Sequence, residues 1–138
     1  MVTTGLASKD RFLSSLVNNY PGMKYVNQQL PASSRVLMPW DGRGYYCLTG
    51  KCLPDVDQNS WTSLVKRAVD SEEVLKWLES NGVTHIFISN TDVAYFVYGH
   101  DPDGYHRQAY DFLVDNVFSN NNLIFKDEEV RIFEITRK

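Results

Sequence analysis

The residues from Asp41 to Tyr46 (Asp-Gly-Arg-Gly-Tyr-Tyr) bring an acid, a base and two phenols together in one glycine-rich turn. The Asp41 carboxylate and the Arg43 guanidinium could hold a polar or anionic group, and the glycines would let the backbone approach it. The turn follows an apolar segment, residues 35–39, that is typical of a buried strand, and ligands of open α/β sheets bind beyond the carboxyl ends of strands. We therefore predict a ligand site formed by Asp41, Arg43, Tyr45 and Tyr46.

A plainer interpretation of the same turn stays open. In it the glycines only reverse the chain, and Asp41 and Arg43 are solvated or paired with each other. The spacing is not the G-x-G-x-x-G pattern of phosphate-binding loops, and the next residues do not resemble the start of a phosphate-binding helix.

Other acids and histidines carry weaker signals. Asp55-Val56-Asp57 has the D-x-D spacing with which nucleotide-sugar transferases hold a divalent ion, but Pro54 favours a plain loop. Residues 100–106 (HDPDGYH) are spaced less regularly than calcium ligands, and Asp, Pro and Gly are ordinary turn residues. His85 lies in an apolar strand, where a lone histidine usually serves the framework. No G-x-S-x-G elbow is present. Because each of these signals is weak, we predict no catalytic residue, no metal and no cofactor.

The two cysteines, Cys47 and Cys52, are too few for a structural zinc site, which usually has four ligands. Their spacing is compatible with a local disulfide in an oxidising compartment and equally with two free buried thiols.

Composition bounds the function. A net charge of −3 and scattered basic residues argue against a nucleic-acid partner. No stretch approaches the roughly 18 to 20 apolar residues that cross a bilayer, and no signal peptide is expected at the start. The aromatic fraction of 13% indicates an aromatic core or, for a protein-interaction domain, an exposed aromatic patch.

The clearest structural signal is a helix, turn and strand over residues 71–89, with Ser71 as the expected N-cap and Asn81-Gly82 as the stop. Apolar spacing predicts five further helices, and turn residues bound the remaining strands. The helices are expected at about 8–19, 21–30, 60–68 and 105–118, with a short one at 92–97. The strands are expected at 35–39, 83–88, 123–126 and 130–135, with an extended segment at 45–48 and a loop at 53–59.

This order predicts one α/β domain over residues 1–138. We expect a Rossmann-like three-layer α/β/α sandwich whose sheet is mostly parallel and ends in a C-terminal antiparallel hairpin.

Four segments in this order carry a family resemblance: Tyr-Val-Asn-Gln-Gln-Leu-Pro at 25–31, Ser-Arg-Val-Leu at 34–37, Gly-Arg-Gly-Tyr-Tyr at 42–46 and Gly-Val-Thr-His-Ile at 82–86. The series resembles the soluble C-terminal region of bacterial and archaeal polytopic membrane glycosyltransferases of the GT-C type. These include the protein-mannosyltransferase-like and arabinosyltransferase-like families, which use polyprenyl-phosphate-linked sugars.

The resemblance implies a non-catalytic accessory domain, because the family's catalytic acids lie in membrane-proximal loops that have no counterpart here. It implies a fragment of an integral membrane protein, placed on the extracytoplasmic face. The implied partners are the transmembrane portion of the same polypeptide and a glycan or lipid-linked sugar. That compartment would favour a disulfide between Cys47 and Cys52. The alternative is a free-standing ligand-binding protein or enzyme with its site at the Asp41–Tyr46 turn.

Overall fold

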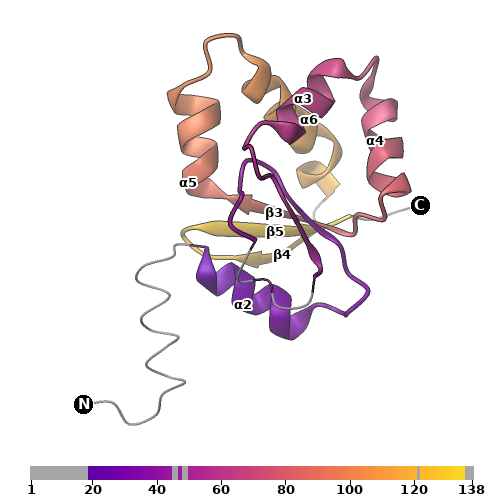
Figure 1. The fold of residues 1–138 in the computed structure, drawn as a ribbon, viewed down its shortest axis with the longest axis vertical. Coiled ribbons are helices and arrows are strands. Elements are labelled where there is room, and N and C mark those ends of the chain that lie inside the picture. Colours follow the sequence, from indigo (N-terminus) through magenta and orange to yellow (C-terminus); the bar gives the residue numbers. More distant parts are fainter. Residues whose placement is uncertain (1–18, 45–46, 48–49, 121, 136–138) are drawn as a thin grey trace.

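The computed structural model describes residues 19–44, 47, 50–120 and 122–135, and Figure 1 shows their arrangement. The predicted helix at 8–19 falls almost entirely outside these residues. The elements in chain order are α2 (Tyr20–Gln29), β1 (Val36–Met38), β2 (Cys52–Pro54), α3 (Ser60–Arg67), α4 (Ser71–Ser80), β3 (His85–Ser89), α5 (Asn90–Val93), the π-helical turn η2 (Ala94–Gly99), α6 (Tyr105–Asn116), the 3₁₀ turn η3 (Phe118–Asn120), β4 (Leu123–Lys126) and β5 (Val130–Glu134).

The five strands form one mixed sheet in the order β2-β1-β3-β5-β4. β1 pairs in parallel with β2 and β3, whereas β5 is antiparallel to both β3 and β4. The α/β class and the C-terminal hairpin are confirmed, but a mostly parallel sheet is not, because two of the four strand pairings are antiparallel. β4 runs in the same direction as β3, and its hairpin partner β5 fills the position between them.

The sequence patterns did not predict the strand that lies beside β1. Residues 45–46 and 48–49, in the expected extended segment, lie outside the described residues. The strand beside β1 is Cys52–Pro54, and its last two residues lie in the segment 53–59 that was expected to be a loop, so that prediction is wrong at its start. A three-residue strand that ends in proline gives almost no period-two signal, and proline is tolerated here because β2 is an edge strand.

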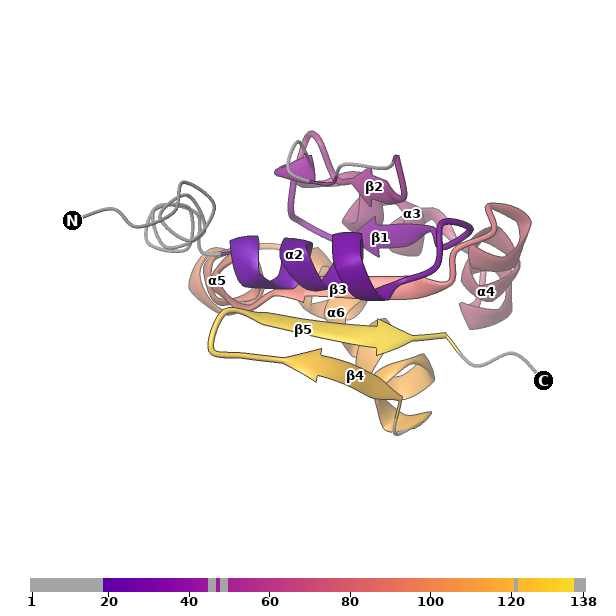
Figure 2. The ribbon, with the colours of Figure 1, turned by 90° about the horizontal axis from the view of Figure 1, so that it is seen from below.

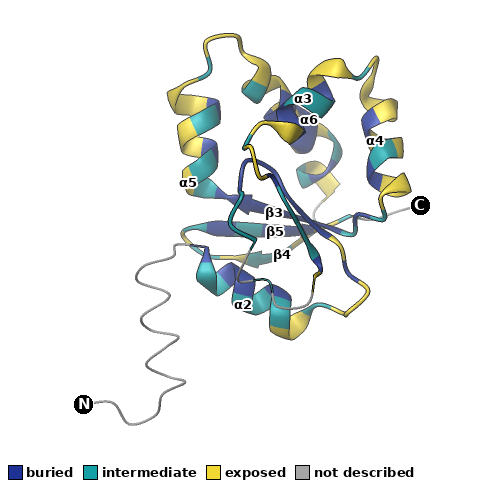
Figure 3. Cartoon of the chain, viewed as in Figure 1, coloured by how far each residue is buried: buried dark blue, intermediate teal, exposed yellow. Residues whose placement is uncertain are grey.

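Two hydrophobic clusters cover the two faces of the sheet, which gives three layers (Figures 2 and 3). Among the described residues, α2 is the helix that packs on one face, through Met23 and Val26 against Phe87. The contact is close at Gly22, where a Cβ atom would lie 2.7 Å from a methyl carbon of Val130. The other face carries α3, α4, η2 and α6, and their side chains enclose Trp40 in the larger cluster.

The α4–β3 unit forms as the sequence predicts, with one difference at its start. The N-cap is Asp70, not Ser71, because the Asp70 carboxylate accepts a hydrogen bond from the backbone N–H of Glu73 at 3.0 Å. Gly82 then takes a left-handed φ of 67° before the chain enters β3, where all five residues are buried.

Candidate functional site

Asp41 lies just beyond the carboxyl end of β1 and is completely buried. Its carboxylate accepts hydrogen bonds from the side-chain amide of Asn19 (3.0 Å) and from the backbone N–H and Nε of Arg43 (2.9 and 3.0 Å). Asn19 immediately precedes α2, so this carboxylate joins the start of that helix to the turn after β1. Tyr45 and Tyr46 lie outside the described residues, and ligand binding by this turn stays a prediction.

Arg43 extends the contact to the neighbouring parallel strand. One of its terminal nitrogens donates to Ser89 Oγ at 3.2 Å and approaches an Asp92 carboxylate oxygen at 3.3 Å. Ser89 ends β3 and Asp92 lies in α5, so the carboxyl ends of β1 and β3 meet in one polar cluster, made of Asn19, Asp41, Arg43, Ser89 and Asp92. The pattern of polar residues directly after the 83–88 strand could have pointed to Ser89 and Asp92.

The cluster holds two carboxylates and one guanidinium, and this imbalance affects Asp92. The pKa of Asp92 rises to about 6, chiefly because the carboxyl is buried and secondly because the Asp41 carboxylate lies nearby; Arg43 opposes both effects. Asp92 therefore changes charge in mildly acidic solution, while the Arg43 guanidinium keeps its ion pair with Asp41.

The turn that carries Asp41 is held in an unusual backbone conformation. Trp40 has a φ of 62°, which is rare for a bulky side chain and is retained only where neighbours impose it. The Asp55 carboxylate accepts the backbone N–H of Trp40 at 2.9 Å, the Asp55 N–H donates to the Asp41 carbonyl at 2.9 Å, and the Gln58 amide donates to the Trp40 carbonyl at 3.2 Å. The Asp55 carboxylate thus holds the backbone of this turn in place. Burial is the main cause that raises its pKa.

The Trp40 side chain leads from this turn to a polar cavity. Its indole N–H lies 3.0 Å from Thr62 Oγ1 and 3.1 Å from His106 Nδ1, and those two atoms are 2.7 Å apart. An indole nitrogen can only donate, so Nδ1 of His106 accepts from Trp40. The cavity has a volume of about 320 Å³ and is lined by Asn59, Thr62, Ser63, Lys66, His100, Asp101, Pro102, Asp103, Tyr105 and His106.

Exposed tyrosines occur on the elements around this cavity. Tyr95 and Tyr98, both in η2, are 62% exposed, and Tyr105 at the cavity wall is 38% exposed. The Phe96 ring, between the first two in sequence, packs against His106 with a centroid separation of 5.4 Å. The π-helical winding of η2, a feature often found at functional sites, thus combines exposed phenols with a ring that contacts the cavity histidine.

The fold has a counterpart among solved structures. The C-terminal globular domain of an oligosaccharyltransferase from Archaeoglobus fulgidus matches 87% of this chain and 97% of its own length, with a TM-score of 0.53 and 15% sequence identity. The two share a fold. No family model and no curated protein matches the sequence. Across the described residues, no helix combines the length and apolar character that a bilayer crossing demands.

Two other acids considered from the sequence, Asp57 and Asp101, form hydrogen bonds that hold the local structure. Asp57 accepts the Ser60 hydroxyl at 2.7 Å, and this bond is the main reason why the Asp57 pKa falls to about 2. Asp101 accepts the backbone N–H groups of His106 and Arg107 at 3.1 and 2.8 Å and so caps α6. Among the described residues, no three His, Cys, Asp or Glu side chains are grouped for a metal ion.

His85 occupies a framework position in β3. It is buried, its Nδ1 lies 2.7 Å from the Thr84 hydroxyl, and its Nε2 lies 3.6 Å from a Glu134 carboxylate oxygen, which is too long for a hydrogen bond. Burial lowers the His85 pKa more than Glu134 raises it.

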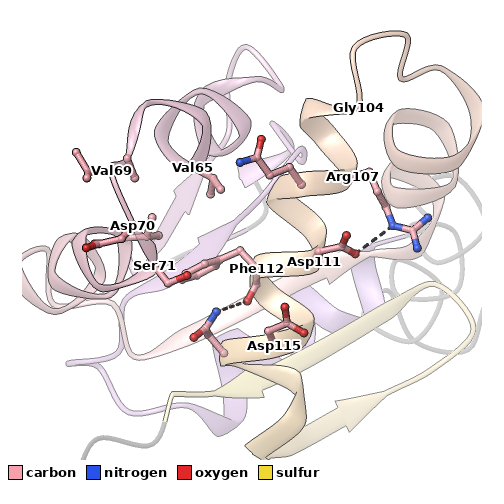
Figure 4. Close-up of a pocket in the computed structure, with 13 residues that line it drawn as sticks. Val65, Val69, Asp70, Ser71, Gly104, Arg107, Asp111, Phe112 and Asp115 are labelled. Carbon is pink, nitrogen blue, oxygen red and sulfur yellow. Dashed lines mark hydrogen bonds and ion pairs between the residues drawn. The ribbon is translucent and has the colours of Figure 1, made fainter.

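A further cavity, of about 480 Å³, lies between the α3–α4 connection and α6 (Figure 4). Two of its acidic side chains already have partners: Asp111 pairs with Arg107 at 3.1 Å and Asp70 caps α4. Val69 at its edge is 90% exposed. We assign no chemistry to this groove.

Cys47 and Cys52 form a disulfide with a Cα–Cα distance of 6.2 Å, and both cysteines pack against the cluster beneath α2. The bridge ties the loop after β1 to the first residue of β2.

Replacing both cysteines by serine is expected to lower the free energy of unfolding by about 2 kcal/mol, because closing a loop of about six residues restricts the unfolded chain by that amount. Urea denaturation of the oxidised wild type and the double variant measures the difference. Thiol titration in denaturant without reductant should detect no thiol; two thiols per chain would contradict the disulfide.

Proposed function

We propose that this chain is a non-catalytic accessory domain of a membrane glycosyltransferase that takes sugars from polyprenyl-phosphate carriers. The observation that carries the proposal is the fold shared over 87% of this chain and 97% of a globular domain from an oligosaccharyltransferase. The sequence resemblance to the C-terminal regions of such enzymes supports the same class. The proposed location is the extracytoplasmic face of the membrane, which suits the disulfide between Cys47 and Cys52.

The charged cluster at the sheet edge supports an accessory role over a catalytic one. Both oxygens of the buried Asp41 carboxylate are engaged by Asn19 and Arg43, and Arg43 also contacts Asp92. A general acid or base must have access to a substrate proton, and the buried Asp41 carboxylate has no such access. We infer that the cluster fastens α2, β1 and β3 together.

The cavity beside this cluster is the proposed contact for a glycan. Sugar rings require polar partners for their hydroxyls and flat apolar faces for their C–H groups. Thr62, Lys66 and His106 line the cavity, and Tyr95 and Tyr98 offer exposed rings nearby. The proposed partners of the domain are therefore the transmembrane portion of its own polypeptide and the glycan or lipid-linked sugar handled there.

Removing the domain from the natural polypeptide is expected to lower sugar transfer at least tenfold, since the membrane portion would lose a surface that presents the glycan. Membranes carrying the whole protein, or the protein without residues 19–138, are assayed for transfer from a polyprenyl-phosphate-linked sugar. Residues 1–138 alone should give no product.

A matched pair of variants tests the assigned face. Tyr95→Ala should reduce transfer several-fold, whereas Leu123→Ala, which truncates an exposed side chain of β4 (45% exposed), should leave it unchanged. Product formed by residues 1–138 alone, or a natural polypeptide without membrane-spanning segments, would refute the accessory role. Equal effects of the two variants would refute only the face.

A further inference from the structure

A third cavity lies on the opposite side of α3 from the polar one. Residues 59, 62, 63 and 66 face the polar cavity, whereas 60, 61, 64 and 67 face this one, as the helical repeat requires. Its volume is about 300 Å³, within the range of small-molecule sites. Its walls are mainly apolar and consist of Leu37, Pro39, Leu53, Pro54, Trp61, Leu64 and Trp77.

Two arginines line this apolar cavity from different elements. Arg67 belongs to α3, and its Nε donates to the Ser63 carbonyl at 3.1 Å. Arg35 precedes β1, and its Nε donates to the Asn81 carbonyl at 2.9 Å. Each guanidinium is thus fixed through Nε. Among the described residues neither forms an ion pair, because the arginine pairs there belong to Arg43 and Arg107.

The acid in the wall does not neutralise them. The Asp55 carboxylate accepts backbone N–H groups from Trp40 and Ser60, both at 2.9 Å, and from Trp61 at 3.5 Å, and its side chain is buried in that turn. The cavity therefore combines an apolar floor, two indole rings and two exposed cations whose terminal nitrogens can donate. Guanidinium groups bind carboxylate and phosphate through paired, charge-assisted hydrogen bonds.

We propose that this cavity binds a small organic anion whose apolar body lies on Leu53, Leu64 and Trp77 and whose carboxylate, sulfonate or phosphate lies between Arg35 and Arg67. The site is independent of the proposed glycosyltransferase role, because it shares no residue with the polar cavity. Binding depends on both parts of the ligand, because burial of the apolar body provides affinity and the anion provides selectivity.

A pair of fluorescent probes of nearly equal shape tests the proposal. Anilinonaphthalene sulfonate carries an anion, and N-phenylnaphthylamine has the same ring system without it. The native protein should bind the sulfonate about tenfold more tightly than the neutral probe, and added salt should weaken only the sulfonate. Near-ultraviolet circular dichroism in the same samples establishes that the protein is folded, since this sulfonate also binds partly unfolded states.

Charge reversal at the cavity provides the matched comparison. Arg67→Glu should weaken sulfonate binding at least tenfold and leave N-phenylnaphthylamine binding unchanged, and Arg35→Gln should act in the same direction. Lys126→Glu makes the same change of charge on β4, at the opposite edge of the sheet, and should alter sulfonate binding less than twofold. Methyl NMR spectra of the native protein should show sulfonate-induced shifts at Leu53 and Leu64.

Three results would overturn the proposal. One is equal affinity for the two probes. Another is an equal loss of sulfonate binding in Arg67→Glu and Lys126→Glu, which would indicate a general charge effect. The third is a set of methyl shifts that omits Leu53 and Leu64, because the probe would then occupy another surface.

Discussion

Replacing Asp41 by alanine is expected to lower the free energy of unfolding by about 3 kcal/mol, because the loss of one buried partner leaves polar groups unsatisfied. The Asn19 amide, the Arg43 backbone N–H and the Arg43 guanidinium all lose the Asp41 carboxylate as an acceptor. Asn19 is buried and gains no direct access to water. Arg43 keeps its contact with Asp92 and is 31% exposed, which limits the loss.

A second aspartate provides the control for this prediction. Asp111 also pairs with an arginine, Arg107, at 3.1 Å, but both side chains are 54% exposed. Exposed pairs contribute little, so Asp111→Ala should change the free energy of unfolding by less than about 1 kcal/mol. Urea denaturation at pH 7 measures both variants against the wild type. A loss at Asp41 no larger than the loss at Asp111 would show that the cluster does not hold the elements together.

Replacing Asp92 by asparagine is expected to change how stability depends on pH. The folded-state pKa of about 6 lies above the ordinary value of 3.8, so the folded protein binds the extra proton between these limits. The stability of the wild type therefore falls as pH rises from about 4 through 6. The two pKa values differ by an amount equivalent to about 3 kcal/mol. The Asp92 side chain is only 14% exposed, which supports a large effect.

The difference between the two proteins isolates this carboxyl group. Relative to the wild type, Asp92→Asn should become more stable by up to about 3 kcal/mol between pH 4 and pH 7. His85 has a lowered pKa, so its contribution is lost as pH falls below about 6.5, but it is present in both proteins and cancels. Asp115→Asn, which changes an exposed side chain of α6, should give a curve parallel to the wild type. A parallel curve for Asp92→Asn would contradict the raised pKa.

In both predictions the polar cluster holds elements of the fold together. The carboxylate of Asp41 and the guanidinium of Arg43 are paired with each other, which is the arrangement of the plainer interpretation of the turn. The proposed ligand contacts lie instead in the two cavities on either side of α3, which neither Asp41 nor Arg43 lines. Arg43 thus connects the carboxyl ends of β1 and β3, and the proposed ligand contacts lie on the helices around this cluster.

Most helices and strands could be predicted because their signals are local. Val74, Leu75, Trp77 and Leu78 of α4 have the apolar spacing that predicts a helix; Val74 and Leu78 are buried, whereas Leu75 is exposed. Gly82 follows the end of the helix because the residue at this position has a positive φ. The cap moved from Ser71 to Asp70 because adjacent polar residues can both cap a helix, and local sequence does not choose between them.

The sequence by itself determined the α/β class, the closing hairpin and the place of the polar turn after the first strand, since caps, periodicity and turn residues act over a few neighbours. Only the tertiary structure decided that β5 enters beside β3, that Ser89 and Asp92 meet Arg43, and that α3 has a cavity on each side. Arg43 and Asp92 lie 49 residues apart in sequence. Such contacts depend on strand order and helix packing, which short-range patterns do not encode.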